Sequence, residues 1–447
     1  MTNNPKVSVV VPSLNSIKYI HECIDSILNQ TLKDIEIICV DAGSTDGTLE
    51  VLREYEKNDE RLKVIVSDKK SYGYQMNLGI KEAKGEYLGI VESDDYIKEN
   101  MYQSLYKIAK ERKIEVLRAD ILEFETIGSE KRIHYASFDN KPYMYGHIVN
   151  SKDDINVMLT IRNLNPPGIY LLQFIRDNNC YFNETLGASF QDTGFFFQIQ
   201  ALANRVFLLN EAYYFYRQDN PEASCKSRTK AFCICDEYDF IYNFVKSNEK
   251  LDGSYMYVVA YLRFCGYEWM LNKIDEKLKY DFIQRFHRDF VVAKNNNEID
   301  WTLFSQWQKN ILQQVIEKPL EFYKQKSCKP IGACEQVKKQ LSYSLGAELI
   351  KSVKNPLLLL FLPYRLFFIY TKYKINKIIL DVLYEKKILT KHLLLEDYAD
   401  YHEAVELKEH LSYKLGESMI KSPIFFIFKI PKIYKNFKNR KGKIKTW

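Results

Sequence analysis

The chain has 447 residues, 46% of them apolar and 27% charged, and its net charge is +6. These values are typical of a soluble globular protein, and the length predicts two or three domains. The modest net charge excludes a generally basic protein, but the charge is uneven, because residues 418–447 hold nine Lys or Arg side chains and no acid. This asymmetry predicts an anionic partner at the C-terminus.

Nine cysteines are scattered along the chain. The nearest pairs are Cys233 with Cys235 and Cys328 with Cys334, and neither pair has the spacing of a zinc finger or of a CxxC redox motif. We therefore expect reduced thiols in a cytoplasmic protein. The first residues, MTNNPK, lead directly into a strand-like run, so no secretory signal is expected.

The first elements alternate between strand and helix. Residues 7–11 (VSVVV) predict a buried strand, and residues 17–30 carry isoleucine and leucine at helical spacing. A second strand at 35–40 ends at Asp41, and the following AGSTDGT contains two glycines that permit a tight turn.

A third strand at 62–66, a helix from about Met76 to Ala83 and a fourth strand at 87–91 complete the pattern. Strands that alternate with helices predict right-handed crossover connections. We therefore expect an α/β fold with a mixed, mostly parallel sheet flanked by helices, followed by a largely helical C-terminal region.

The fourth strand stops abruptly at the polar residues Glu92, Ser93, Asp94 and Asp95. In open α/β sheets, ligands bind at this carboxyl edge. Adjacent aspartates repel each other unless a cation or hydrogen-bond donors hold them, and Mg²⁺ or Mn²⁺ prefers one or two carboxylates together with phosphate oxygens. The motif predicts a divalent metal that carries a phosphate-bearing ligand. The alternative is a solvated turn in which Asp95 caps a helix.

The segments VSVVVPSLN, VDAGSTDGT and GEYLGIVESDD, in this order and at these spacings, resemble the nucleotide-sugar domain of the family 2 glycosyltransferases. That family has the GT-A fold, a Rossmann-like sheet with flanking helices. The resemblance covers residues 5–220 and is strongest to bacterial enzymes that build capsular or other surface polysaccharides. It implies that residues 41–46 contact the nucleoside and that residues 92–95 hold Mn²⁺ or Mg²⁺ on the diphosphate.

By this resemblance, the metal ligands are Asp94 and Asp95. The residues expected to bind the nucleotide sugar are Pro12, Asn15, Asp41, Ser44, Asp46, Lys69, Asn77, Ser93, Asp94, Gln191 and Arg217. The chain departs from the family pattern at Ala42, where the family often has a second acid, and at Glu92, where the motif usually begins with Asp. Gln75 and Met76 replace an alanine and an arginine, so Lys69 or Lys70 is expected to supply a cation for phosphate.

Gln191 and Asp192 follow a polar turn and precede a predicted helix. By resemblance, Asp192 matches the general base of the inverting members, which takes the proton of the acceptor hydroxyl. Gln191 replaces the usual Glu and is expected to orient that hydroxyl. The spacing alone also fits an alternative in which Asp192 is an ordinary helix-capping residue. The sequence leaves this alternative open. Arg217 ends a strand-like run and is expected near the pyrophosphate, or else on the surface of an edge strand.

The C-terminal region contains an internal repeat. LSYSLGAELIKS (341–352) matches LSYKLGESMIKS (411–422), and each copy precedes a proline-interrupted apolar stretch too short to cross a bilayer. Apolar segments flanked by lysines predict a position on an anionic membrane surface. A helical hairpin buried against the rest of the protein, or a dimer contact, is the alternative. No recognised fold presents the basic tail, so no nucleic-acid partner is expected.

Three domains are predicted: a GT-A domain (1–225), a helical domain (226–330) and a repeat-containing, basic membrane-surface region (331–447). The predicted function is that of an inverting, metal-dependent glycosyltransferase that moves a sugar of hexosyl type from a UDP-sugar to a saccharide acceptor, free or lipid-linked. We expect it at the inner face of a bacterial membrane, in capsule or surface polysaccharide synthesis. The alternatives are a non-catalytic scaffold that binds a nucleotide sugar, and a nucleotidyltransferase, which is disfavoured because no glycine-rich triphosphate loop follows the first strand.

Overall fold

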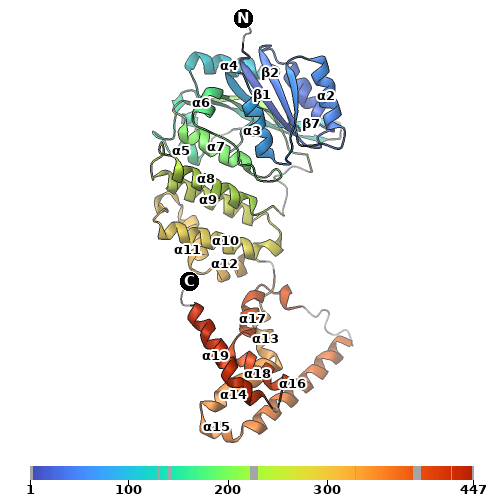
Figure 1. Cartoon of the computed structure of the whole chain (residues 1–447), viewed down its shortest axis with the longest axis vertical. Helices are drawn as coiled ribbons and strands as arrows, with labels where there is room; N and C mark the ends of the chain where they lie inside the picture. Colours follow the sequence, from blue (N-terminus) through green and yellow to red (C-terminus); the bar gives the residue numbers. More distant parts are fainter. Residues whose placement is uncertain are drawn as a thin grey trace. The chain divides into compact units, whose positions relative to one another are not determined.

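The computed structural model describes residues 4–128, 130–137, 142–221, 230–327, 329–385, 394–423 and 425–444. Cys328 and the last three residues of the basic tail lie outside these ranges. The chain forms two compact units, Met1–Ile316 and Glu317–Trp447 (Figure 1). The first unit contains a sheet with flanking helices and then further helices, and the second unit is helical. The division into three domains stays a prediction.

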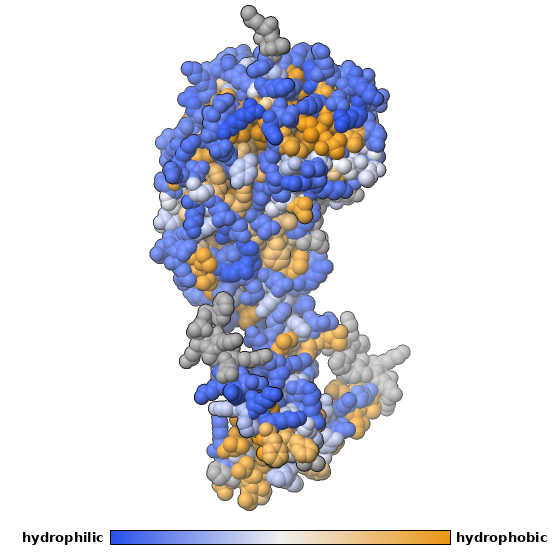
Figure 2. All heavy atoms as spheres, viewed as in Figure 1, coloured by the Kyte–Doolittle hydropathy of each residue, from blue (hydrophilic) through white to orange (hydrophobic). Residues whose placement is uncertain are grey.

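The two units differ in how far they bury their apolar side chains. The N-terminal unit encloses them in a core around the sheet. Most of the large apolar side chains that are exposed belong instead to the C-terminal unit, although it is much the shorter of the two. Figure 2 shows orange residues gathered in this unit, where Figure 1 labels α15 (Pro356–Leu360).

The strands of the N-terminal unit are β1 (Val7–Ser13), β2 (Ile35–Asp41), β3 (Leu62–Val66), β4 (Tyr87–Ile90), β5 (Tyr96–Ile97), β6 (Val116–Ile127), β7 (Glu130–Ala136), β8 (Ile148–Val149), β9 (Gly168–Leu171) and β10 (Val206–Arg217). They form one sheet in the order β3-β2-β1-β4-β9-β6-β10-β5, with β7 paired to β6 and β8 to β10. The run β3-β2-β1-β4 is parallel, whereas β9 is antiparallel to both β4 and β6. The predicted fold class, a mixed sheet with flanking helices and a largely helical C-terminal region, is confirmed.

The first helices are α1 (Ile20–Leu28), α2 (Thr48–Asn58), α3 (Tyr72–Glu82), α4 (Met101–Arg112), α5 (Asn156–Leu159), α6 (Leu172–Asp177) and α7 (Gln191–Leu202), with a 3₁₀ turn at Pro142–Met144. Helix α3 begins earlier than its predicted start at Met76. The reason is a cap that the apolar pattern does not reveal: the Ser71 hydroxyl accepts the N–H of Tyr74 at 3.2 Å.

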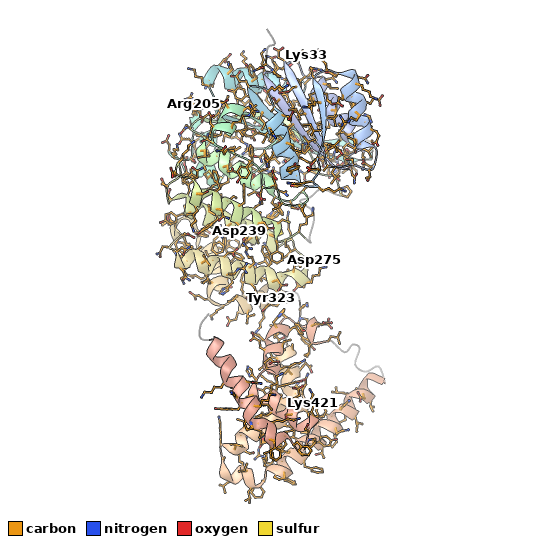
Figure 3. The ribbon with its side chains drawn as sticks, viewed as in Figure 1. Lys33, Arg205, Asp239, Asp275, Tyr323 and Lys421 are labelled. Carbon is orange, nitrogen blue, oxygen red and sulfur yellow. The ribbon has the colours of Figure 1, made fainter. Side chains whose placement is uncertain are left out.

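The remaining helices of this unit are α8 (Cys233–Ser247), α9 (Tyr255–Leu271), α10 (Glu276–Asn295) and α11 (Gln306–Glu317), with a 3₁₀ turn at Trp301–Leu303. Asp239 of α8, labelled in Figure 3, forms ion pairs with Arg263 of α9 and Arg285 of α10. The fully buried ring of Tyr267 packs among phenylalanines of α10. Aromatic packing and shared ion pairs therefore hold these three helices together.

The helices of the C-terminal unit are α12 (Pro319–Lys326), α13 (Ala333–Lys339), α14 (Leu341–Val353), α15, α16 (Leu362–Glu385), α17 (Tyr401–Lys408), α18 (Leu411–Lys421) and α19 (Phe426–Ile444), with a 3₁₀ turn at Leu395–Asp397. The two repeat copies form α14 and α18, which touch at Gly346 and Gly416. A Cβ atom at Gly346 would lie 1.7 Å from the carbonyl oxygen of Ser412, and one at Gly416 would lie 1.7 Å from that of Ser342. The repeat thus builds a helix pair whose two halves make matching contacts.

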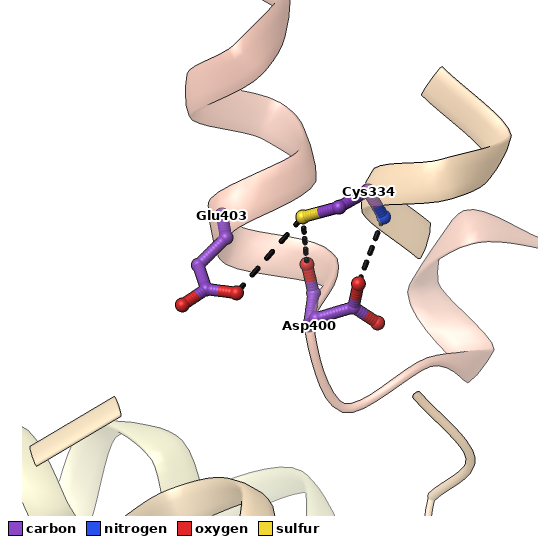
Figure 4. A group of neighbouring side chains, drawn as sticks. All are labelled: Cys334, Asp400 and Glu403. Carbon is purple, nitrogen blue, oxygen red and sulfur yellow. Dashed lines mark hydrogen bonds between the residues drawn. The ribbon is translucent and has the colours of Figure 1, made fainter. Parts of the chain in front are cut away.

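Asp400 caps the start of α13 from a distant part of the chain. Its carboxylate accepts the backbone N–H groups of Gly332, Ala333 and Cys334 at 2.7, 2.8 and 2.8 Å. Figure 4 shows the bond from Cys334. Burial raises the pKa of such a carboxyl, but these backbone hydrogen bonds outweigh it and lower the pKa of Asp400 to about 2. The charge of Asp400 is therefore part of what holds α13 and α17 together.

Cys334, Asp400 and Glu403 are, among the described residues, the only group that places three potential metal-ligand atoms within 4.8 Å of one another. The Cys334 thiol lies 3.9 Å from Glu403 (Figure 4), and Glu403 forms an ion pair with Lys324 at 2.6 Å. Because Asp400 serves as a helix cap and Glu403 already has a cationic partner, we assign this group a structural role.

Candidate active site

The loop after β2 is shaped by the buried carboxylate of Asp41. Its Oδ1 accepts the N–H groups of Gly43 and Ser44, and its Oδ2 accepts the hydroxyls of Ser13 and Ser44 at 3.0 and 2.5 Å. Gly43 lies at φ +79° and Gly47 at φ +102°, in the region that favours glycine. The predicted tight turn is therefore present, and Asp41 fixes its backbone.

The loop after β1 is joined to this turn. The Asn15 side chain accepts the N–H of Thr45 at 2.9 Å, and the Ser44 hydroxyl accepts the N–H of Asn15 at 2.8 Å. Asp46 accepts the N–H of Ile17 at 3.0 Å. Pro12, also expected at the donor site, lies inside β1 opposite Val40 and is buried. The structure thus brings the predicted nucleoside-contacting residues of the two loops together at the carboxyl ends of neighbouring strands.

A cluster of acids follows β4. Glu92 accepts the hydroxyl of Tyr72 at 2.7 Å, and the half-exposed Asp94 accepts the amide of Asn220 at 2.7 Å. Asp95 is only 2% exposed and accepts the hydroxyl of Tyr214 at 2.7 Å and the N–H of Arg217 at 2.8 Å. The alternative reading, a solvated turn capped by Asp95, is wrong, because Asp95 binds β10 instead of a helix end.

Burial and the charges of neighbouring acids disfavour the charged forms of Glu92 and Asp95. Burial, with a smaller effect of the charges of Asp94 and Asp192, raises the pKa of Glu92 to about 8. Burial and the charge of Asp94 raise the pKa of Asp95 well above its usual value. A cation bound at this site would reduce the repulsion between the crowded carboxylates and favour their charged forms.

This arrangement fits the divalent metal that the sequence predicts. Mg²⁺ and Mn²⁺ are held in such sites by one or two carboxylates, and substrate phosphates complete the shell. Asp94 is the better placed ligand because it is half-exposed, while Asp95 uses both oxygens on protein donors. Ser93, next to them, pairs its hydroxyl with that of Ser16 at 2.7 Å and so ties the acid cluster to the loop after β1.

The alternative prediction for Arg217, a surface position on an edge strand, is wrong. Arg217 is 9% exposed, and its guanidinium donates to the carbonyl oxygen of Asp94 and to the carboxylate of Glu22, both at 2.6 Å. The guanidinium also stacks on the rings of Tyr19 and Phe124 at 4.4 and 4.5 Å. Arg217 thus lies beside the acid cluster and holds its backbone, and its contact with a pyrophosphate stays a prediction.

Asp192 lies in the first turn of α7. Burial raises its pKa to about 6, and its charge acts on Glu92. Sequence reasoning expected Gln191 to orient an acceptor, but its amide already accepts the N–H of Ser189 and donates to Thr185 and Gly187. Gln191 therefore fixes the loop that precedes Asp192, and any contact with an acceptor remains untested.

Two further predicted residues contact another segment. Asn77 binds the backbone of Phe182 through both ends of its amide, at 2.9 Å each. Lys69 lies 3.5 Å from the carboxylate of Glu184 and 4.1 Å from the centroid of the Tyr74 ring. Both side chains thus hold the segment 182–184 against the start of α3, and their contact with a donor stays a prediction.

Sequence reasoning missed the residues that support the acids. Tyr72 and Tyr214 donate to Glu92 and Asp95, and Glu22 pairs with Arg217. The buried amide of Gln75 donates to the carbonyl oxygens of Ser13 and Val40, which joins the ends of β1 and β2. In the sequence, Gln75 stands out only as a departure from the family pattern. Tyr214 gives no signal because it lies in a run of aromatic residues, and Tyr72 gives none because it lies in a polar stretch without a motif.

Comparison with known proteins agrees with this geometry. The model of the glycosyl transferase family 2 matches residues 8–163, and that of a domain of unknown function, DUF8374, matches residues 266–439. The chain is 33% identical over 226 residues to glycosyltransferase GlyG of Streptococcus pneumoniae, an alignment that covers 47% of this chain and 70% of that protein. It is 31% identical over 215 residues to poly(ribitol-phosphate) β-N-acetylglucosaminyltransferase TarS of Staphylococcus aureus, covering 47% of this chain and 35% of TarS.

Among solved structures, residues 1–349 of S. aureus TarS in complex with UDP-GlcNAc match with a TM-score of 0.57 and 22% identity, covering 71% of this chain and 89% of that one. The match supports a GT-A-like fold. On the family model and the GlyG alignment, the chain belongs to the family 2 glycosyltransferases. It is therefore a glycosyltransferase by family, which removes the nucleotidyltransferase alternative.

Proposed function

We propose that this chain transfers a sugar, with inversion at the anomeric carbon, from a UDP-sugar to a saccharide acceptor. The observation that carries the proposal is the place of Asp192, which lies half-buried in the first turn of α7 and close enough for its charge to act on Glu92 of the acid cluster. Burial raises the pKa of Asp192 to about 6. A carboxylate with such a pKa suits a general base near neutral pH. The UDP-GlcNAc named with the TarS structure supports uridine as the nucleoside of the donor.

The reaction is a single displacement. The acceptor oxygen forms a bond to the anomeric carbon while the bond from that carbon to the diphosphate breaks, and Asp192 takes the hydroxyl proton. Asp94 and Asp95 would hold Mn²⁺ or Mg²⁺, and the ion would supply positive charge to stabilise the leaving diphosphate. The loop residues Asn15, Asp41, Ser44 and Asp46 position the nucleoside.

The acceptor and the place of the reaction are part of the same proposal. GlyG and TarS bear the names of transferases, and TarS acts, by its name, on a poly(ribitol-phosphate). The name of TarS supports a polymeric acceptor that carries hydroxyl groups. We propose a saccharide acceptor, free or lipid-linked, in synthesis of a capsule or another surface polysaccharide. We place the enzyme in the cytoplasm, peripheral to the inner face of the membrane. The chain's exposed apolar and cationic C-terminal segments support this placement.

The test is release of nucleoside diphosphate from a panel of nucleotide sugars, together with their effect on thermal stability, with and without Mn²⁺. We expect a UDP-sugar to stabilise the protein and to release UDP, and we expect Asp94→Ala to abolish release while the fold stays intact. Asp281→Ala, which removes an exposed carboxylate of α10, is the matched control. Stabilisation by a nucleotide sugar without any release would instead support the scaffold alternative, and full activity of Asp94→Ala in excess chelator would remove the metal assignment.

A further inference from the structure

The repeat places an exposed apolar segment after each helix of the α14–α18 pair. After α14 stand Leu357, Leu360 and Phe361, with exposed fractions of 77%, 80% and 59%. After α18 stand Phe425 and Phe428, with exposed fractions of 62% and 81%. Soluble proteins rarely leave such side chains open in groups, and a group of this kind marks a surface that binds a partner.

Helix α16 extends the first of these segments. One of its faces, with Leu362, Leu366 and Ile369, packs on the core between α14 and α18. The opposite face is also apolar and is exposed, and its spacing is helical: Tyr364, Phe367, Phe368, Ile375, Ile378 and Ile379. Within the part of the C-terminal unit that the structure describes, only one face of α16 therefore has a partner.

Cations border these apolar surfaces. Lys372, Lys374 and Lys377 are exposed on α16, whose two acids stand toward its end, at Asp381 and Glu385. Helix α19, Phe426–Ile444, contains no acid, and its Lys432, Lys435 and Lys438 follow the exposed Phe428. Long lysine side chains can reach past an apolar surface to anionic head groups.

We propose that the exposed side chains after α14 and α18, together with the outer face of α16, dock the C-terminal unit on an anionic lipid bilayer. The exposed side chains are those of Leu357, Leu360, Phe361, Phe425 and Phe428. This proposal deepens, and rests on, the membrane placement in the proposed function, and it gives the matched domain of unknown function a role. The apolar side chains enter the interface between head groups and acyl chains, and the lysines of α16 and α19 bind lipid phosphates.

The charges favour a bilayer over a second copy of the chain. A two-fold contact places the same surface of each copy against the other, so the lysine-bordered face would meet its own cations. Length favours surface docking over insertion across the bilayer, since no described helix combines the length and hydropathy that a membrane span requires. An anionic bilayer offers an apolar interior to the exposed side chains and anionic head groups to the lysines.

The experiment is flotation of the full-length protein with vesicles of phosphatidylcholine alone or with phosphatidylglycerol, at low and high salt. We expect binding only to the anionic vesicles. The variant Leu360→Ser/Phe361→Ser/Phe428→Ser should weaken it at least tenfold at every salt concentration. Lys432→Gln/Lys435→Gln/Lys438→Gln should weaken it by a similar factor at low salt and much less at high salt, because salt screens the cations. Val292→Ser/Trp307→Ser removes exposed apolar side chains of the N-terminal unit and should change nothing.

The outcomes separate the proposals. Release of UDP from the donor should be equal in all these variants, so loss of vesicle binding with normal release supports docking. Failure of the wild-type protein to release UDP would overturn the proposed reaction and leave the vesicle result standing. Absence of vesicle binding by the wild type at low salt would overturn the docking proposal. Unchanged binding by the serine variant, together with a shift from dimer to monomer in solution, would assign the surface to a second copy instead.

Discussion

In the N-terminal unit charged side chains are buried, whereas in the C-terminal unit large apolar side chains are exposed. Asp41, Asp95 and Glu237 are each at most 2% exposed, while Leu360 and Phe428 are at least 80% exposed. Burial of a charge is costly unless hydrogen bonds or partners compensate, and exposure of apolar surface is costly in water. Buried charge therefore lowers the stability of the N-terminal unit, and exposed apolar surface lowers that of the C-terminal unit.

This difference between buried charge and exposed apolar surface indicates different roles for the two units. The N-terminal unit has a large core around the sheet, and this core can support buried acids whose positions are fixed before substrate binds. The pair α14–α18 has a small core, formed by Leu345, Leu349, Leu415 and Met419. Its stability and solubility depend more on what covers its outer surface. This contrast agrees with the two proposals, which give chemistry to the first unit and attachment to the second.

The largest effect is expected from Asp192→Asn in the N-terminal unit. The variant is nearly isosteric but cannot accept a proton, so turnover should fall by ~10²- to 10⁴-fold while UDP still stabilises the protein as in the wild type. Steady-state rates of transfer and thermal shifts with UDP measure the two effects. Asp177→Asn, at an exposed end of α6, is the control. A variant that keeps more than half of the wild-type turnover would leave Asp192 as a helix-terminal residue without a role in catalysis.

The same residue predicts a dependence on pH. Burial raises the pKa of Asp192 to about 6, and the base acts only when deprotonated. The rate should therefore be constant above this pH and should fall roughly tenfold for each unit below it. The residual rate of Asp192→Asn should lack this fall. A wild-type profile that stays flat down to pH 4 would assign the base to another group.

The fold could be predicted from the sequence because its signals are local. The run 7–11 and the strand before Glu92 are apolar, lie at the centre of the sheet and end at polar residues, so pattern and position agree. The repeat at 341–352 and 411–422 predicts two similar helices. It does not predict that Gly346 and Gly416 bring them into contact, because that contact depends on packing across 70 residues of chain.

The site could be predicted only in part for the same reason. Asp94, Asp95 and Asp192 stand at strand or helix ends, where sequence pattern and family resemblance coincide. The hydrogen bonds that hold the acid cluster, from Tyr72 to Glu92 and from Tyr214 and the backbone of Arg217 to Asp95, come from residues that are distant in sequence. Burial raises the pKa of Glu92 and Asp192. It depends on how the whole unit packs, so it could not be predicted from the sequence.

A smaller effect is expected from Gly346→Ala in the C-terminal unit. The added methyl group would lie 1.7 Å from a backbone oxygen of Ser412, which cannot move without separating the helices. Overpacking of this kind costs about 3 kcal/mol at a rigid site. Denaturant unfolding should show loss of stability in the C-terminal transition only, and UDP release should be unchanged. Gly253→Ala, where a Cβ atom meets nothing within 4 Å, is the control. An equal loss in both transitions would show that the two units unfold together.

The smallest effect is expected from Asp400→Asn, which tests whether the C-terminal unit also uses a buried charge. The folded-state pKa of about 2, compared with 3.8 for a free carboxyl, corresponds to about 2 kcal/mol of stability. Because the folded-state pKa is lowered, this stabilisation is present above pH 3.8 and is lost as the pH falls through about 2. The difference in unfolding free energy between wild type and variant should thus have its largest value at pH 7 and should decrease below pH 4. Glu396→Gln, at an exposed carboxylate nearby, should have no such effect. A difference that does not change with pH would mean that the lost hydrogen-bond geometry, and not the charge of Asp400, destabilises α13.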